Sequence, residues 1–177
     1  MLIGDPFKFS ILVNAVNEWC YSNEISGGVM IITVDGFMFP ADEVLNISLD
    51  CAVSELIENL KEIPVNKGVF DLKDKESAFK EIYNLVYCEH IYPDDDSIEE
   101  DWRYKIAPTE FFDKDLSVFA VSDGENVRIL ASKLKYVKKY SCHKLNNITV
   151  REAYVTCADI DTMIKRLNDW LNYYEKK

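Results

Sequence analysis

Two pairs of residues in this chain combine side-chain types and spacing that could support chemistry. Cys142 and His143 are adjacent, and a thiol beside an imidazole could act as an activated nucleophile. Cys88 and His90 are separated by one residue and could bind zinc. Neighbouring residues on a strand face opposite sides, however, and the zinc pair lacks a second pair of ligands at a recognisable spacing. We therefore expect neither a catalytic centre nor a metal site, and no cofactor.

The acidic residues from Glu89 to Asp101 form a third candidate, because seven carboxylates lie within 13 residues without any lysine or arginine. An EF-hand loop needs a glycine at its sixth position, which this run lacks, so a dedicated calcium site is not expected. Two alternatives remain for the run. It is either a solvated loop or a surface that recognises another protein.

Aromatic residues beside the acidic run favour a recognition surface. Tyr92 and Trp102 flank it, and Phe111 and Phe112 follow between further acids. Aromatic anchors rimmed by charge are typical of tight protein interfaces, and ordinary core packing is the alternative for these rings. We predict that the partner-binding residues are Asp94, Asp95, Asp96, Glu99, Glu100, Asp101 and Trp102.

The composition limits the classes of partner. The net charge is −11 and the isoelectric point is near 4.6, so nucleic acid is repelled and a basic protein is attracted. No apolar run approaches the roughly 18–20 residues that a membrane-spanning helix needs. With no signal peptide at the start of the sequence, we expect a cytoplasmic protein whose five cysteines are reduced.

The elements that must position these residues are predicted to be strands and helices in separate runs. Alternating or β-branched apolar residues, bounded by turn residues, predict strands over residues 8–16, 28–34, 37–39, 47–49, 102–107, 116–121, 127–131 and 147–157. Asp35-Gly36 and Asp123-Gly124 predict tight turns between strands. The lysine-rich residues 133–144 predict a solvated strand edge or loop.

Helical periodicity predicts three amphipathic helices. Apolar residues recur at three- and four-residue steps over 53–63, which ends at Pro64, and over 78–86, with Asp74 as the N-cap. The C-terminal stripe from Ile160 through Trp170 is the clearest, with Asp159 or Asp161 as its cap. We therefore predict one α+β domain over residues 1–177, with a largely antiparallel sheet, helices packed on it and a C-terminal amphipathic helix.

Three segments resemble a known family. The N-terminal order Ile3-Gly4-Asp5-Pro6, followed by an aromatic residue, Lys8, Phe9 and Ile11, resembles the start of the bacterial immunity protein 42 family. Residues 28–31, followed by the hairpin around Asp35-Gly36 that ends at Pro40, look like the second strand of that family and its hairpin. The strand pair at residues 118–122 and 127–130 looks like its C-terminal third.

The resemblance implies a function. Members of the family are small antitoxin partners of polymorphic and contact-dependent growth-inhibition toxins. It implies an immunity protein that binds the C-terminal domain of a cognate toxin, often a nuclease, and blocks it without catalysis. The alternatives from other classes are a small cytoplasmic enzyme that uses Cys142 or His143, and a non-catalytic adaptor module.

Overall fold

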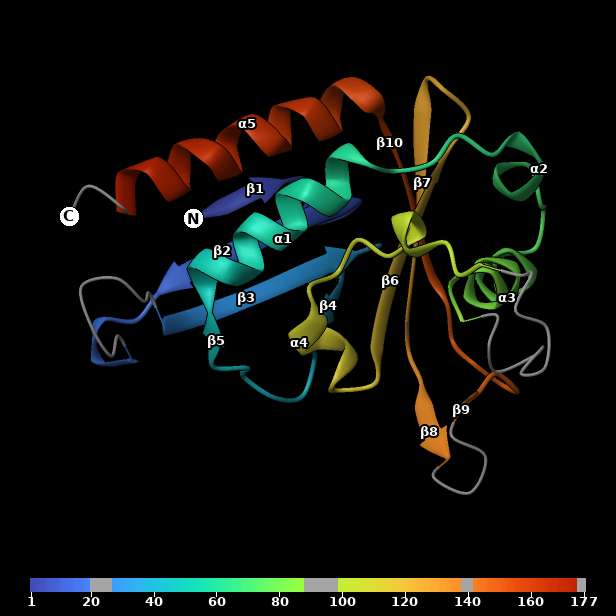
Figure 1. The fold of residues 1–177 in the computed structure, drawn as a ribbon, viewed down its shortest axis with the longest axis horizontal. Helices are drawn as coiled ribbons and strands as arrows, with labels where there is room; N and C mark the ends of the chain where they lie inside the picture. The colour runs from blue at the N-terminus through green and yellow to red at the C-terminus, as the bar shows by residue number, and fades with distance from the viewer. Residues whose placement is uncertain (20–26, 88–98, 138–141, 175–177) are drawn as a thin grey trace.

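The computed structural model describes residues 1–177 except 20–26, 88–98, 138–141 and 175–177. Figure 1 shows helices packed on two sheets that run in different directions. In the described part of the chain every pair of named strands is antiparallel. The α+β class with a largely antiparallel sheet is therefore confirmed.

The first sheet has the strand order β1-β2-β3-β4, and β5 pairs with the other end of β3. Its strands are β1 (Leu2–Gly4), β2 (Phe9–Ala15), β3 (Gly27–Val34), β4 (Phe37–Phe39) and β5 (Ile47–Ser48). The predicted Asp35-Gly36 turn is confirmed, because both residues have positive φ angles, 52° and 71°, as a type I′ hairpin turn requires.

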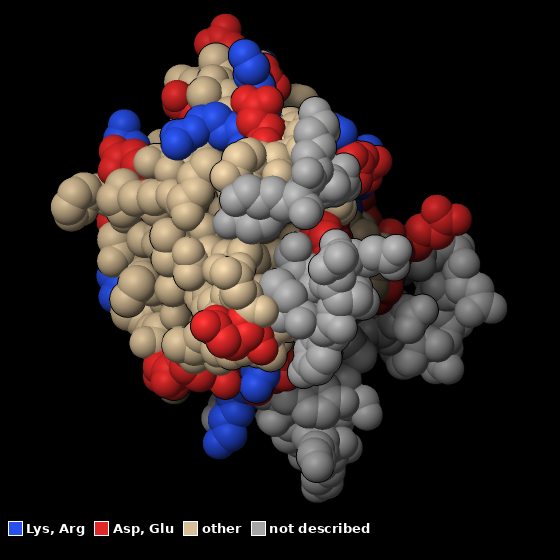
Figure 2. Space-filling view, turned by 90° about the vertical axis from the view of Figure 1, so that its left-hand side faces the viewer, with Lys and Arg blue, Asp and Glu red and all other residues tan. Residues whose placement is uncertain are grey.

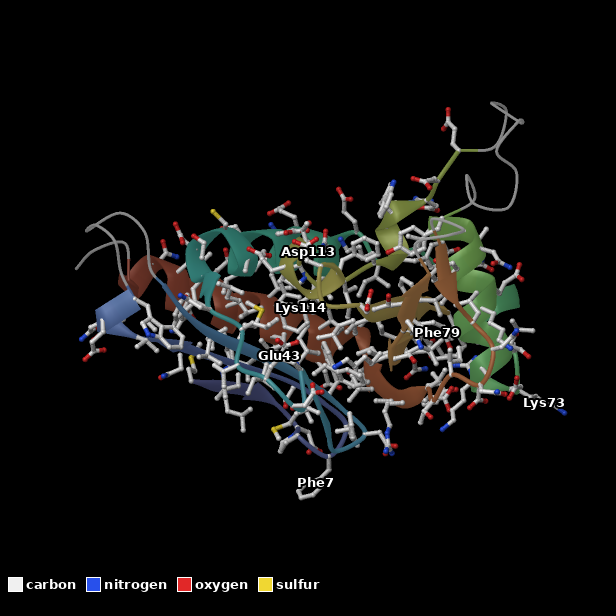
Figure 3. The ribbon with its side chains drawn as sticks, turned by 90° about the horizontal axis from the view of Figure 1, so that it is seen from below. Phe7, Glu43, Lys73, Phe79, Asp113 and Lys114 are labelled. Carbon is white, nitrogen blue, oxygen red and sulfur yellow. The ribbon has the colours of Figure 1, made fainter. Side chains whose placement is uncertain are left out.

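The N-terminal Gly-Asp-Pro segment is a structural turn between β1 and β2. Gly4 has a φ of 91°, and a Cβ atom built there would lie 2.4 Å from the carbonyl oxygen of Phe9. The Asp5 carboxylate accepts the backbone N–H of Phe7 at 2.9 Å. Only glycine fits at position 4, and the Phe7 ring beyond it projects into solvent with 82% exposure (Figure 3).

Two helices cover one face of the first sheet. Figure 1 shows α1 (Leu49–Lys61) and α5 (Cys157–Tyr174) side by side above it. Their apolar stripes join the inward residues of β2 and β3 in one core, which includes Trp170. Seen from the side of the two termini, the molecule presents a broad area of uncharged residues (Figure 2).

The second sheet separates two cores. It has the order β10-β7-β6, with β6 (Leu116–Ser122), β7 (Asn126–Lys133) and β10 (Arg151–Thr156). Val118 and Ala120 belong to the first core, whereas Phe119 and Val121 belong to a second core with α3 (Lys75–Val86). Because consecutive residues of β6 face opposite sides, both of its faces are buried.

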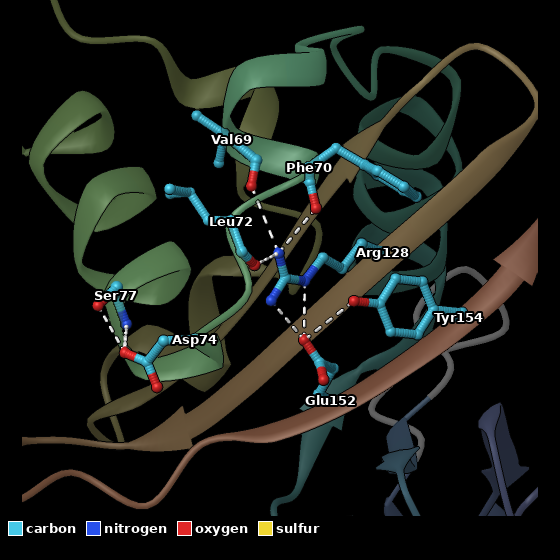
Figure 4. Close-up of polar contacts among 8 residues, drawn as sticks. All are labelled: Val69, Phe70, Leu72, Asp74, Ser77, Arg128, Glu152 and Tyr154. Carbon is cyan, nitrogen blue, oxygen red and sulfur yellow. Dashed lines mark hydrogen bonds and ion pairs between the residues drawn. The ribbon is translucent and has the colours of Figure 1, made fainter.

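A buried arginine ties the short helix α2 (Lys67–Phe70) to the second sheet (Figure 4). Arg128 of β7 is 1% exposed, and its Nη1 donates to the carbonyl oxygens of Phe70 and Leu72 at 2.8 and 2.6 Å. Its Nε donates to Glu152 Oε1 at 2.7 Å. Asp74 caps α3 as predicted, since its carboxylate accepts the N–H of Ser77 at 2.8 Å.

The structure differs from several predictions in the remaining elements. Residues 102–107 are not a strand: η3 (Trp102–Tyr104) is a 3-10 turn, and only Lys105 forms a bridge, to Phe119. Leu49 begins α1 instead of ending β5, and the strand expected over 147–157 is confined to β10. The other described elements are η1 (Asn17–Trp19), α4 (Thr109–Phe112), β8 (Lys135–Val137) and β9 (Cys142–Lys144).

Neither predicted cap residue occupies the N-cap position of α5. Thr156 precedes the first helical residue, and its hydroxyl accepts the N–H of Asp159 at 3.1 Å. The Asp159 carboxylate accepts the N–H of Thr156 at 3.0 Å in return. This reciprocal pair is a capping box, so Asp159 supports the helix from its third position.

Candidate binding surface

The segment that follows the acidic run is held against the end of α3. The N–H of Asp101 donates to the carbonyl oxygen of Leu85 at 2.9 Å. The Asp101 carboxylate accepts from Arg103 Nε at 2.8 Å and Nη2 at 2.7 Å, and from the Arg103 N–H at 3.2 Å. Asp101 therefore caps η3, and the bonds from Arg103 hold the pKa of this carboxyl below its usual range.

The Trp102 side chain projects from this fixed segment and is 48% exposed. Its ring meets Tyr87 edge-on, with centroids 5.3 Å apart and planes at 86°. Tyr87 also stacks on Phe112 at 5.5 Å and contacts Tyr83 at 4.6 Å. The exposed ring of Trp102 thus rests on buried aromatic neighbours, while Phe111 is fully buried in the first core.

Lys105 lies against the same aromatic group. Its Nζ is 5.8 Å from the ring centroid of Trp102 and 5.6 Å from that of Phe112. Burial lowers the pKa of the Lys105 ammonium, although the carboxylates of Glu55, Asp113 and Glu110 act in the opposite direction. The carboxylates that act on Lys105 therefore come from α1 and from the α4 region.

Burial also raises the pKa of the Tyr87 hydroxyl, and the nearby Tyr83 and Glu100 contribute to the same shift. Glu100 is half-buried and acts on Tyr87, and the exposed Glu99 precedes it in the chain. We call the set Glu99, Glu100, Trp102, Lys105 and Phe112, with Glu55, Glu110 and Asp113, the acidic–aromatic surface.

The structure describes part of the predicted site. Glu99, Glu100, Asp101 and Trp102 are consecutive and belong to one segment, whereas Asp94, Asp95 and Asp96 lie outside the described residues. The sequence did not point to Lys105 or Glu55 as parts of this surface, or to Tyr87 as the ring that Trp102 packs against. Lys105 is separated from Glu55 by 50 positions along the chain, so no local pattern signals their proximity.

The structure places the two chemical motifs considered from the sequence only in part. Cys142 and His143 are consecutive residues of β9, and Cys88 and His90 lie outside the described residues. Within the described ranges, no group of three or more histidine, cysteine, aspartate or glutamate side chains could hold a metal ion. Among those same residues, no helix has the length and apolar character that crossing a bilayer requires.

Comparison with known proteins identifies the family. The family model of immunity protein 42 matches residues 1–170. The crystal structure of CdiI from Burkholderia dolosa has the same fold, with a TM-score of 0.71 and 16% sequence identity over 96% of this chain and 99% of that one. No curated protein sequence matches. Because the family model spans almost the entire chain, the protein belongs to the immunity protein 42 family, and its function is to neutralise a cognate toxin.

Proposed function

We propose that this immunity protein binds its toxin through the acidic–aromatic surface and blocks it by occlusion, without a reaction of its own. The observation that carries the proposal is Trp102, a large ring that is 48% exposed on a segment fixed by α3 and by Arg103. Such a ring loses little conformational freedom on binding and buries a large area, which is typical of an interface anchor. Glu99 and Glu100 supply charge at its edge.

The charge of this surface suits a basic partner. Many toxins in such systems are nucleases, whose substrate clefts are positively charged, and carboxylates can occupy such a cleft in place of phosphates. Asp94, Asp95 and Asp96 would continue the acidic surface along the chain. We propose a nuclease domain of a contact-dependent growth-inhibition toxin as the partner and the cytoplasm as the place of encounter.

Association kinetics test this proposal. The toxin C-terminal domain encoded upstream of this protein is immobilised, and binding is measured over a series of salt concentrations. Electrostatic steering predicts that the wild-type association rate falls roughly tenfold or more from low to high salt. The double variant Glu99→Lys/Glu100→Lys should associate more slowly at low salt and show a flatter salt dependence.

Glu18→Lys/Glu81→Lys is the matched control, because it changes the net charge equally at η1 and α3, outside the defined surface. It should alter the association rate much less than the double variant at Glu99 and Glu100. Equal effects of the two double variants would show that only the overall charge matters. Identical rates for all three proteins would exclude this surface as the interface.

A further inference from the structure

A cavity of about 570 Å³ opens where the β4 hairpin meets the ends of the second sheet. Its wall includes Phe37 and Phe39 of β4, Lys133 at the end of β7, Lys135 of β8, and Arg151 at the start of β10. Cavities of roughly 300–1,000 Å³ are the usual size for small-molecule sites. The acidic–aromatic surface contributes no residue to this wall.

The charge of the cavity is opposite to that of the chain. Its described wall carries three cationic side chains and no carboxylate, although the chain has a net charge of −11. The cations come from three different strands: Lys133 and Lys135 lie two positions apart in the lysine-rich segment, and the fold brings Arg151 of β10 to them. A cluster of this kind focuses a positive potential into a concave space.

Two of these cations form ion pairs with exposed carboxylates, and such pairs are weak. Lys133 Nζ pairs with Asp42 at 3.0 Å, and Arg151 Nη1 with Asp35 at 3.7 Å; these carboxylate side chains are 68% and 52% exposed. Exposed ion pairs contribute little to stability, so a better anion can replace either carboxylate. The Lys135 ammonium makes no ion pair with any residue that the structure describes.

Arg151 is held in one orientation. Its guanidinium carbon lies 4.7 Å from the centroid of the Phe37 ring, and that ring meets Phe39 at 5.3 Å. Stacking on a ring leaves the in-plane N–H groups of arginine available for paired hydrogen bonds to oxyanions. Asn146, Asn147 and Thr149 add polar groups to the same wall.

We propose that this cavity binds a small ligand that carries two or more phosphate groups. One phosphate accepts from Arg151 and Lys133, in place of the exposed carboxylates, and another is met by Lys135. A ligand with a single phosphate would leave part of the cationic wall and most of the volume unused. The proposed site shares no residue with the acidic–aromatic surface, so its test does not depend on that surface binding the toxin.

Isothermal titration calorimetry of the full chain with pyrophosphate and with ATP at low ionic strength tests the site. The wild type should bind pyrophosphate or ATP at one saturable site. Lys135→Glu should weaken that binding by about tenfold or more, because it replaces a charge-assisted hydrogen bond with repulsion. Lys165→Glu on α5 is the matched control, exposed and absent from the cavity wall, and should bind as the wild type does.

Arg151→Lys adds a second test, since it keeps the charge but removes the planar fork, and should also weaken binding. Unchanged melting temperatures would show that the variants remain folded. The proposal is overturned if the wild type binds neither anion saturably, or if Lys165→Glu weakens binding as much as Lys135→Glu. Citrate binding as tight as that of pyrophosphate would overturn the assignment to phosphate.

Discussion

At the scale of single residues, two aromatic side chains that follow the acidic run, Trp102 and Phe111, have opposite environments. The sequence left both core packing and interface anchoring open for Trp102 and Phe111. Phe111 is fully buried, whereas Trp102 is 48% exposed, because Asp101 caps a 3-10 turn that directs the indole outward over Tyr87. Among the residues that the structure describes, Trp102 is therefore the exposed ring of the acidic–aromatic surface.

Replacing this ring tests its function as an anchor. Trp102→Ala should weaken toxin binding by ~2 kcal/mol or more, mainly through faster dissociation, because an anchor ring is desolvated only in the complex. Surface-immobilised toxin gives both rate constants. Phe7→Ala is the matched control, since Phe7 is an exposed ring in the turn between β1 and β2 and should not affect binding.

A dissociation rate for Trp102→Ala equal to that of the wild type would show that the ring lies outside the interface. The same would follow if Phe7→Ala and Trp102→Ala accelerated dissociation equally. The melting temperature of each variant, measured without toxin, separates a loss of contact from a loss of fold.

Some residue environments were beyond prediction from one sequence. Arg128 lies in a segment whose neighbours predict a strand, yet its side chain is buried and bonds to carbonyl oxygens of residues 69–72, more than 50 positions earlier. A buried arginine normally has hydrogen-bond partners. Those of Arg128 in this segment are backbone carbonyl groups, which every residue type provides, so no sequence pattern marks them. The position of Lys105 beside Trp102 and Phe112 likewise depends on contacts between distant parts of the chain.

At the scale of elements, periodicity predicted the helices and most strands. The helices α1, α3 and α5 and the hairpin at Asp35-Gly36 lie where the apolar spacing and turn residues predicted them. The strand predicted over 102–107 was wrong because the apolar alternation there reflects the burial of the Tyr104 and Ile106 side chains, and not pairing along a strand. Short irregular segments take their shape from tertiary contacts, which spacing alone does not encode.

The C-terminal helix depends on Trp170 for its attachment. Trp170 is 7% exposed and belongs to the core that joins α1, α5 and the first sheet. Trp170→Ala should lower the free energy of unfolding by ~3–5 kcal/mol, as expected when a large buried side chain leaves a cavity. Urea unfolding followed by circular dichroism measures the change, and a loss too small to detect would contradict burial of this ring.

The capping box of α5 predicts a dependence of stability on pH. Hydrogen bonds from the Thr156 N–H and hydroxyl lower the pKa of the Asp159 carboxyl, so the folded protein binds this proton less readily than the unfolded chain. Its stabilisation is complete above the ordinary pKa of about 4 and is lost as the pH falls through the lower folded-state value.

Asp159→Asn removes this titration and keeps a hydrogen-bond acceptor. The variant should therefore lose less stability than the wild type between roughly pH 4 and pH 2. Urea unfolding across that range gives the comparison. Parallel pH profiles for the two proteins would show that the carboxyl of Asp159 does not contribute to acid sensitivity.

At the scale of the whole molecule, charge is unevenly distributed. Glu100 and the carboxylates of Glu55, Glu110 and Asp113 belong to the acidic–aromatic surface, while uncharged residues dominate the described part of the face seen in Figure 2. The net charge predicted a basic partner, but it did not predict the cationic cavity at Arg151, because Arg151 meets Lys133 and Lys135 only in the folded chain. Composition therefore limits the class of partner, but it does not show where on the molecule the binding sites lie.

Growth rescue tests the central claim most directly. The toxin C-terminal domain encoded upstream is expressed in bacteria together with wild-type protein or with one of two variants. The wild type should restore growth. Cys142→Ala/His143→Ala should restore it equally, because neutralisation requires binding and no reaction. Glu99→Lys/Glu100→Lys/Trp102→Ala should fold but fail to protect. Full protection by that triple variant, or lost protection in the folded, toxin-binding Cys142→Ala/His143→Ala protein, would contradict neutralisation by occlusion through the acidic–aromatic surface.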